Sequence, residues 1–153
     1  MKTNTKRKAS GFFIVEILIV LAIIAILVTA LLPNLNTYTK RAKFADVLTV
    51  AESLKPAVEL CILQIGTPGS TVPTACQQGT NGIPATIASG DYLNAPNVDN
   101  STVGASGAIS VAGTAAVFGT AYTYTLTPTF NTVAGGSTVN WTAGCTCQAA
   151  GLC

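Results

Sequence analysis

One acidic side chain stands alone in the most apolar stretch of this sequence. Residues 12–32 read FFIVEILIVLAIIAILVTALL, and Glu16 is the one charged residue among them. A carboxylate inside a membrane helix costs a few kcal/mol unless a positive group pairs with it. The stretch holds no lysine or arginine. Cleavage after Gly11 would supply a partner, the new α-amino group of Phe12, because residues four apart share one face of a helix.

The second set of reactive side chains is the five cysteines, all of which follow the apolar stretch: Cys61, Cys76, Cys145, Cys147 and Cys153. This distribution suits an oxidising compartment outside the inner membrane, where disulfides persist. Cys61 and Cys76 are well placed for a disulfide that ties a loop to the end of a helix. Three further thiols without a histidine favour disulfides over zinc in such a compartment, so we expect no metal site.

Histidine is absent from the sequence, and this narrows the functions that the chain can have. Without it the chain lacks the usual general base, a common metal ligand and every Ser-His or Cys-His pair. We therefore expect a protein that is not an enzyme and that carries no cofactor.

The basic residues gather near the start of the chain, where four of the eight lie within the first eight positions: Lys2, Lys6, Arg7 and Lys8. Beyond Lys43 the one remaining base is Lys55. Nucleic-acid binding normally requires a basic patch or stripe. Nucleic acid can still be a partner, but the distribution of charge does not support it.

The elements that position Glu16 are a leader at residues 1–11 and a membrane helix at residues 12–33. A helix over the 12–32 apolar run spans roughly 30 Å, the thickness of a bilayer core. The basic leader, MKTNTKRKASG, would stay cytoplasmic, so the rest of the chain would be exported. A secretory signal has a shorter apolar run followed by its cleavage site, whereas Gly11 precedes the run here. An ordinary signal anchor remains an alternative, but it does not explain Glu16.

The segment Gly11-Phe12-Phe13-Ile14-Val15-Glu16-Ile17 resembles the class III signal of type IV pilins and the related pseudopilins. That family has a glycine, then an apolar residue that is usually phenylalanine, then a glutamate at the fifth mature position. Phe13 and Ile14 depart from the commoner Thr-Leu. Pro33 falls at the 22nd mature position, where pilins have a helix-kinking proline. The resemblance is close over residues 1–40 and holds only in outline beyond them.

The resemblance implies a precursor that a prepilin peptidase cleaves after Gly11 and methylates at the Phe12 amine. Glu16 would then contact the Phe12 amine of an adjacent subunit while an inner-membrane assembly platform adds subunits to a helical filament. The protein would reside in the inner membrane with a periplasmic head before assembly, and in an extracellular pilus afterwards. Adhesion, twitching motility and DNA uptake are the roles that the family implies.

Residues 34–65 are predicted to form an amphipathic stem that continues the membrane helix as far as Gly66. Apolar residues recur mostly every three or four positions, at Leu35, Tyr38, Ala42, Ala45, Leu48, Leu54, Val58, Cys61 and Ile65. Pro33 either marks the membrane edge or lets the helix unwind when subunits pack. Lys40, Arg41 and Lys43 either form a solvated face or pair with acids of a neighbouring subunit.

Residues 66–153 are predicted to form the globular head. A long loop is expected at 67–105, and strands at 108–111, 115–118, 121–127 and 138–143, with Pro128 ending the third and a hairpin turn at 133–137. The fold class is α+β, and three or four antiparallel strands packed on the stem resemble the pilin α/β roll. The family also implies a C-terminal disulfide, in which either Cys145 or Cys147 pairs with Cys153. The odd cysteine is left free, pairs between subunits or carries an adduct.

Three other functions compete with that of a major pilin. A minor or competence pilin that binds DNA would need basic residues that the head lacks, unless a filament aligns those of the stem. A type II secretion pseudopilin would generally lack this cysteine pattern. An enzyme is remote because histidine is missing.

Overall fold

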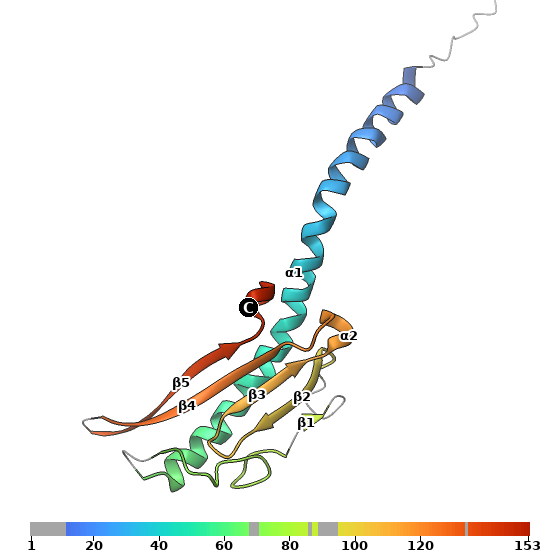
Figure 1. Ribbon diagram of the computed structural model, residues 1–153. Helices are drawn as coiled ribbons and strands as arrows, with labels where there is room; N and C mark the ends of the chain where they lie inside the picture. The colour runs from blue at the N-terminus through green and yellow to red at the C-terminus, as the bar shows by residue number, and fades with distance from the viewer. Residues whose placement is uncertain (1–11, 68–70, 86, 89–94, 134) are drawn as a thin grey trace, which may run out of the picture. The chain divides into compact units, whose positions relative to one another are not determined.

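The structure is a computed structural model, and it describes residues 12–67, 71–85, 87–88, 95–133 and 135–153 of the 153-residue chain (Figure 1). The chain divides into two units, Met1–Asn36 and Thr37–Cys153. The leader predicted at residues 1–11 lies outside the described residues.

One helix, α1 (Phe12–Ile65), accounts for 54 residues and belongs in part to each unit. The helix continues through both Pro33 and Pro56, each of which lacks the N–H for one helical hydrogen bond. It ends where the sequence predicts, since the N–H of Gly66 donates to the carbonyl oxygen of Ile62 at 2.8 Å and Pro68 follows two residues later. A proline cannot continue a helix, and the residue before it is biased toward an extended conformation.

The second unit holds a five-stranded antiparallel sheet in the order β1-β2-β3-β4-β5 (Figure 1). The strands are β1 (Ile87–Ala88), β2 (Val98–Val103), β3 (Ile109–Gly113), β4 (Thr123–Val133) and β5 (Gly136–Cys145). The last two form the longest pairing, from Tyr124 opposite Cys145 to Val133 opposite Gly136. The hairpin therefore lies where the sequence predicts it. A 3₁₀ turn, η1 (Gln148–Ala150), precedes the C-terminus.

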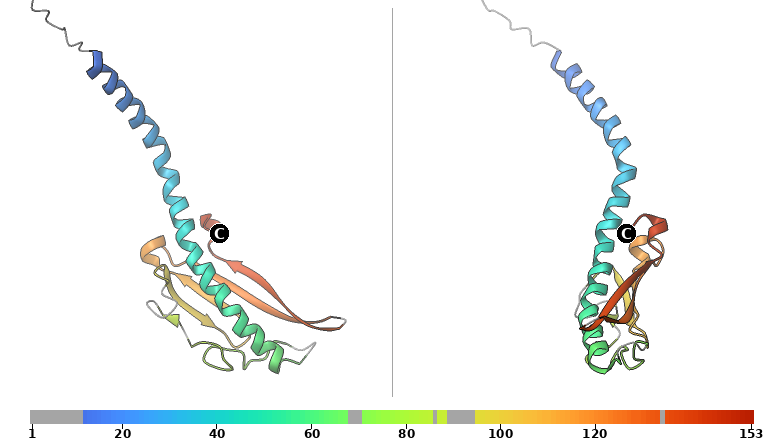
Figure 2. Two further views of the ribbon diagram at one scale, coloured as in Figure 1. Left: turned by 180° about the vertical axis from the view of Figure 1, so that it is seen from behind. Right: turned by 90° about the vertical axis from the view of Figure 1, so that its left-hand side faces the viewer.

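The stem half of α1 lies against one face of this sheet, so the second unit has two layers (Figure 2, right). The core between them combines helix residues such as Val47 and Val58 with strand residues such as Ile109, Val111 and Leu126. Inward residues alternate with outward ones along β3, as expected for a sheet with one buried face. The α+β fold predicted from the sequence is confirmed.

The apolar residues by which the stem was predicted are only partly buried. Leu35, Tyr38, Ala42 and Ala45 are exposed, as is Ile65 at the far end. The core instead takes an overlapping stripe: Phe44, Val47, Val50, Ala51, Leu54, Val58, Cys61 and Ile62. A helix with apolar residues on several sides offers more than one stripe, and periodicity does not reveal where the covering sheet begins.

The predicted loop at 67–105 contains two strands, β1 and β2, so that prediction was wrong in part. The sequence of β2, VDNSTV, has a polar centre and a register irregularity between Val98 and Asn100. Its inward positions, Val98, Ser101 and Val103, therefore do not follow a strict alternation. An irregular strand loses the period-2 signal by which strands are recognised.

Residues Ala115–Phe118 form a short helix, α2, where the sequence predicted an extension of a strand. Gly119 closes it in the left-handed conformation, with φ of 85°, and its N–H donates to the carbonyl of Ala115. The turn places the Phe118 ring edge-on to that of Phe44, with ring centroids 5.6 Å apart. This aromatic contact with the stem explains why four apolar residues leave the sheet.

Pro128 does not end its strand, contrary to the prediction. It lies in the middle of β4, opposite Trp141 of β5. The pairing of β4 with β3 stops at Leu126, so β4 has a partner on one side only at this point. A proline is tolerated in a strand where its missing N–H faces an unpaired side.

Candidate assembly helix and cysteine sites

The N-terminal part of α1 presents a continuous apolar surface. Residues Phe13–Leu32 are long and apolar enough to cross a membrane, and none of them is buried in the protein. Exposed apolar surface of this extent normally marks a contact with lipid or with other protein. This helix is therefore the candidate site of membrane anchoring and subunit contact.

Glu16 projects from this apolar helix as the structure describes it. It is exposed, and the residues one turn away, Phe13, Ile19 and Val20, are exposed apolar side chains. Phe12 is the first residue of α1, one turn before Glu16, while Gly11 lies outside the described residues. The cleavage site and the pairing of Glu16 with an amine remain predictions. Pro33 lies within α1, and its role in assembly is also a prediction.

Two of the three basic residues in the stem bind backbone carbonyls within the second unit, which neither interpretation of the sequence anticipated. Lys40 donates to the carbonyl oxygen of Phe118 at 3.2 Å, and the Arg41 guanidinium donates to the carbonyl oxygen of Gly151. Lys43 is exposed. Lys40 and Arg41 thus hold α2 and the C-terminal tail against the stem. Both carbonyl groups lie at the ends of short turns, where carbonyl oxygens have no partner within the turn.

A polar group that the sequence analysis missed joins β5 to the stem. The indole N–H of Trp141 donates to a carboxylate oxygen of Glu59 at 2.6 Å. Lys55 lies 5.8 Å from the centre of the Trp141 ring and forms an ion pair with Glu52 at 2.6 Å. The spacing of Lys55 and Glu59 on one helix face was a usable signal, but the partner strand could not be known without the register of β5.

Cys61 and Cys76 form a disulfide, with their Cα atoms 5.8 Å apart. Both are fully buried at the end of the stem, next to Ile62 in the core. The bond fixes the chain after Gly66 to the helix that precedes it. This is the pairing that the sequence favoured.

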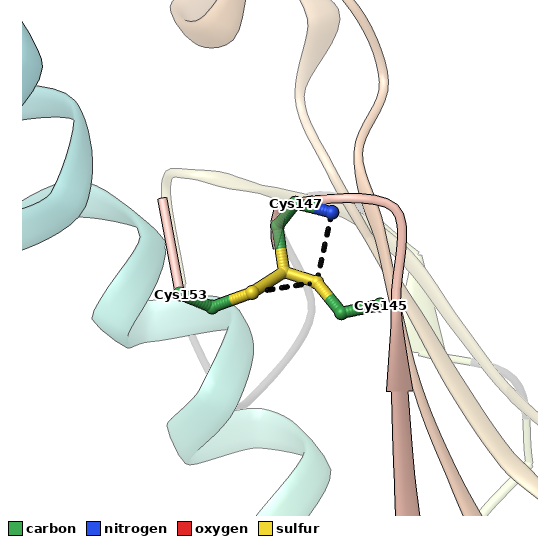
Figure 3. Close-up of side chains that lie close together, drawn as sticks. All are labelled: Cys145, Cys147 and Cys153. Atoms are coloured by element: carbon green, nitrogen blue, oxygen red, sulfur yellow. Dashed lines mark hydrogen bonds between the residues drawn. A yellow bond between two sulfur atoms is a disulfide. The ribbon is translucent and has the colours of Figure 1, made fainter. Parts of the chain in front are cut away.

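The other three cysteines converge at the C-terminus (Figure 3). The sulfur atoms of Cys145, Cys147 and Cys153 all lie within 4.8 Å of one another. Cys147 is bonded to Cys153, and its Cα atom lies 5.1 Å from that of Cys145. The sequence left Cys145 and Cys147 open as partners of Cys153. The structure bonds Cys147 to Cys153, and a sulfur held in a disulfide is not a thiolate ligand for a metal.

Comparison with known proteins relates the chain to pilus proteins. TapA, a type IV pilus subunit protein of Aeromonas hydrophila, is 38% identical over 78 residues, which make up 51% of this chain and 51% of TapA. Prepilin peptidase-dependent protein D of Escherichia coli K12 is 30% identical over 141 residues, 92% of this chain and 86% of that protein. The type IV major pilin protein PilE1 of Neisseria gonorrhoeae is 33% identical over 100 residues, 65% of this chain and 44% of PilE1.

The match thus spans about half the length of TapA and most of the length of the Escherichia coli protein. No family model and no solved structure matches the chain. The match to the Escherichia coli relative covers most of both chains, and the apolar N-terminal helix is the element expected of a pilin. The chain belongs to the type IV pilin family.

Proposed function

We propose that this chain is the precursor of a structural subunit of a type IV pilus, which polymerises through its N-terminal helix. The observation that carries the proposal is the exposed apolar surface of Phe13–Leu32, interrupted by the single carboxylate of Glu16. A soluble protein would bury such a surface in its own core. The family membership of the chain supports the same function.

The proposed maturation creates the group that Glu16 needs. A prepilin peptidase hydrolyses the amide bond between Gly11 and Phe12 and then methylates the new Phe12 amine, which stays positively charged. When the helix leaves the bilayer for the filament interior, Glu16 pairs with this amine on an adjacent subunit. An unpaired carboxylate is unfavourable both in the bilayer and in the filament interior. Because the pair forms only when Glu16 of one subunit lies beside the Phe12 amine of the next, it also fixes the axial register between subunits.

The proposed location changes with assembly. Before assembly the helix anchors the subunit in the inner membrane, and the second unit, Thr37–Cys153, is periplasmic. An inner-membrane platform then adds the subunit to an extracellular filament. The disulfides of the second unit support an oxidising compartment on that side of the membrane.

The charges of the head support a structural subunit over a DNA-binding minor pilin. Lys40 and Arg41 are engaged with backbone carbonyls, and Lys55 is paired with Glu52. Among the described residues this leaves Lys43 as the base of the stem without such a contact. Electrostatic binding to a phosphate backbone depends on several basic residues acting together.

The intact mass of the protein purified from sheared filaments of its host tests this function. We expect a chain that begins at Phe12, carries one methyl group, and is abundant in the filaments. Deleting the gene should remove visible filaments, whereas loss of a minor DNA-binding pilin would leave filaments and abolish DNA uptake. Material that begins at Met1 and still forms normal filaments would contradict the proposal.

A variant at the cleavage site provides the second test. Gly11→Ala should leave the leader attached to most of the protein, because glycine is the residue that the class III signal carries before the cleaved bond. Alanine is small enough to permit some residual cleavage. Ser10→Ala, one residue upstream, is the matched control and should be processed normally. Rapid normal processing of Gly11→Ala would refute the assigned site.

A further inference from the structure

The number of cysteines in the second unit leaves one without an exclusive partner. The chain has five cysteines, and Cys61 pairs with Cys76 in the core at the end of the stem. The remaining three lie together at the end of β5 and in the tail. Since a disulfide uses two sulfurs, an oxidised monomer keeps one thiol within this triad of Cys145, Cys147 and Cys153.

Cys147 occupies the central position of the cysteine triad. Figure 3 shows its sulfur between those of Cys145 and Cys153. The Cα atom of Cys147 lies 5.1 Å from that of Cys145 and 5.7 Å from that of Cys153, and a disulfide can span either distance. A cysteine sulfur forms only one disulfide at a time. The two bonds of Cys147 are therefore alternatives to each other.

Burial distinguishes the three sulfurs further. Cys147 is completely buried and belongs to the core together with Leu152. Cys145 is half-buried, and Cys153, at the end of the chain, is exposed. A thiol at either outer position can reach solvent, whereas a thiol at Cys147 cannot. A disulfide, which carries no ionisable proton, is well suited to the buried central position.

We propose that the cysteine triad is a thiol–disulfide exchange site, in which Cys147 stays oxidised and the free thiol alternates between Cys145 and Cys153. The Cys145 thiolate attacks the Cys147 sulfur, forms the Cys145–Cys147 bond and releases Cys153 as a thiolate, which takes up a proton. The reverse step restores the Cys147–Cys153 bond. One thiol and one disulfide are present before and after, so no oxidant or reductant is consumed.

The exchange makes the tail a modification site for small aliphatic disulfides. The exposed Cys153 thiolate attacks a disulfide R–S–S–R, forms a Cys153–S–R bond and releases RS⁻. The Cys145–Cys147 bond remains intact during this step. The triad thereby accepts one adduct per chain, while the buried Cys61–Cys76 bond accepts none.

Thiol labelling of the oxidised full-length protein in detergent, followed by disulfide mapping without reduction, tests the exchange. Excess N-ethylmaleimide should trap the free thiol at both Cys145 and Cys153. A dilute, bulky maleimide should label almost only Cys153, because the thiol re-equilibrates to the more exposed position before each reaction. Label on Cys147, or a Cys145 to Cys153 ratio that does not depend on the reagent, would overturn the proposal.

Two serine variants provide the controls for adduct formation. Wild type incubated with oxidised glutathione should gain one glutathione per chain at Cys153. Cys145→Ser, which leaves only the Cys147–Cys153 bond, and Cys153→Ser, which leaves only the Cys145–Cys147 bond, should gain none. A retained thiol in Cys145→Ser, or wild type recovered entirely as a disulfide-linked dimer, would also overturn it. Unchanged circular dichroism confirms that the variants are folded.

This proposal goes beyond the pilus function and does not depend on it. The labelling requires only an oxidised, folded chain, so it can fail while filaments form normally. In the same way, a chain that never polymerises can still show the exchange.

Discussion

The carboxylate of Glu16 is the side chain on which the proposed assembly depends most directly. In Glu16→Gln the charge is lost while the shape is kept, and the Phe12 amine of the neighbouring subunit then lies unpaired in a dry interior. Removing one partner of a buried ion pair costs about 3–5 kcal/mol. We therefore expect normal cleavage and membrane insertion, with filament yield reduced by more than about tenfold, since about 1.4 kcal/mol corresponds to a factor of ten.

The control for this variant is Thr29→Ala in the same apolar helix. The Thr29 hydroxyl donates to the carbonyl of Ile26 at 2.8 Å, so its hydrogen bond is satisfied within its own helix. Its removal should leave the filament yield, counted by electron microscopy of sheared material, close to that of wild type. Equal yields from Glu16→Gln and Thr29→Ala would contradict the pairing.

Trp141 is the side chain that joins β5 to the stem most specifically. Trp141→Phe removes the N–H that donates to Glu59 but keeps an aromatic ring over Lys55. A hydrogen bond to a charged group contributes about 1.5–3 kcal/mol, and we expect a loss near the lower end because both side chains are half-buried. Urea unfolding of Trp141→Phe, Glu59→Gln and the double variant would measure the coupling between them. Fully additive effects would show that the contact contributes no coupling energy.

At the scale of elements, the stem divides into an exposed part and a covered part, and two matched variants separate them. Phe44→Ala removes a fully buried ring from the contact with Phe118, and such a change costs about 3–5 kcal/mol. Leu35→Ala changes a side chain that is 54% exposed, so the stability of the head should stay the same. Thermal unfolding followed by circular dichroism compares the two. A similar loss of stability in Leu35→Ala would show that Leu35 also belongs to the buried face of the stem.

The long helix, the hairpin and the α+β class could be predicted because their signals are local. An unbroken apolar run, a Gly-Thr-Pro stop after Ile65 and a glycine-rich turn beyond Val133 each act within a few residues. The strand at Val98–Val103 and the helix at Ala115–Phe118 could not be predicted, because partners distant in sequence determine them. Val98 pairs with Gly113, and Phe118 packs on Phe44.

The candidate sites could also be predicted where their signal is local, and could not where it depends on residues distant in sequence. Glu16 can be recognised from the sequence alone, because it is the single charged residue in an apolar run. The Trp141–Glu59 contact joins residues 82 positions apart and depends on the register of β5. The central position of Cys147 depends on how the tail turns at Gln148–Ala150, and three cysteines in ten residues carry no information about that turn.

At the scale of the whole molecule, the second unit should be an independent soluble protein. The unit Thr37–Cys153 contains the complete core and all five cysteines, whereas the exposed apolar surface of Phe13–Leu32 lies in the first unit. A chain that begins at Thr37 and is exported to the periplasm should therefore fold and remain monomeric without detergent. Full-length protein should require detergent.

Size-exclusion chromatography and circular dichroism of the fragment check this prediction. Phe44→Ala in the same fragment is the control, and it should lower the unfolding temperature while leaving the oligomeric state unchanged. A fragment that aggregates when its disulfides are intact would show that the head contributes to assembly through apolar surface of its own.

The disulfide at the end of the stem has a mechanical consequence for a subunit of a filament. A pulling force on α1 reaches the chain beyond Gly66 through the last helical turns. The covalent bridge between Cys61 and Cys76, which have a sequence separation of 15, lies at this point, so the segment that it closes cannot lengthen under force. Pulling must instead separate the stem from the sheet, a two-layer core that yields only when many contacts break together.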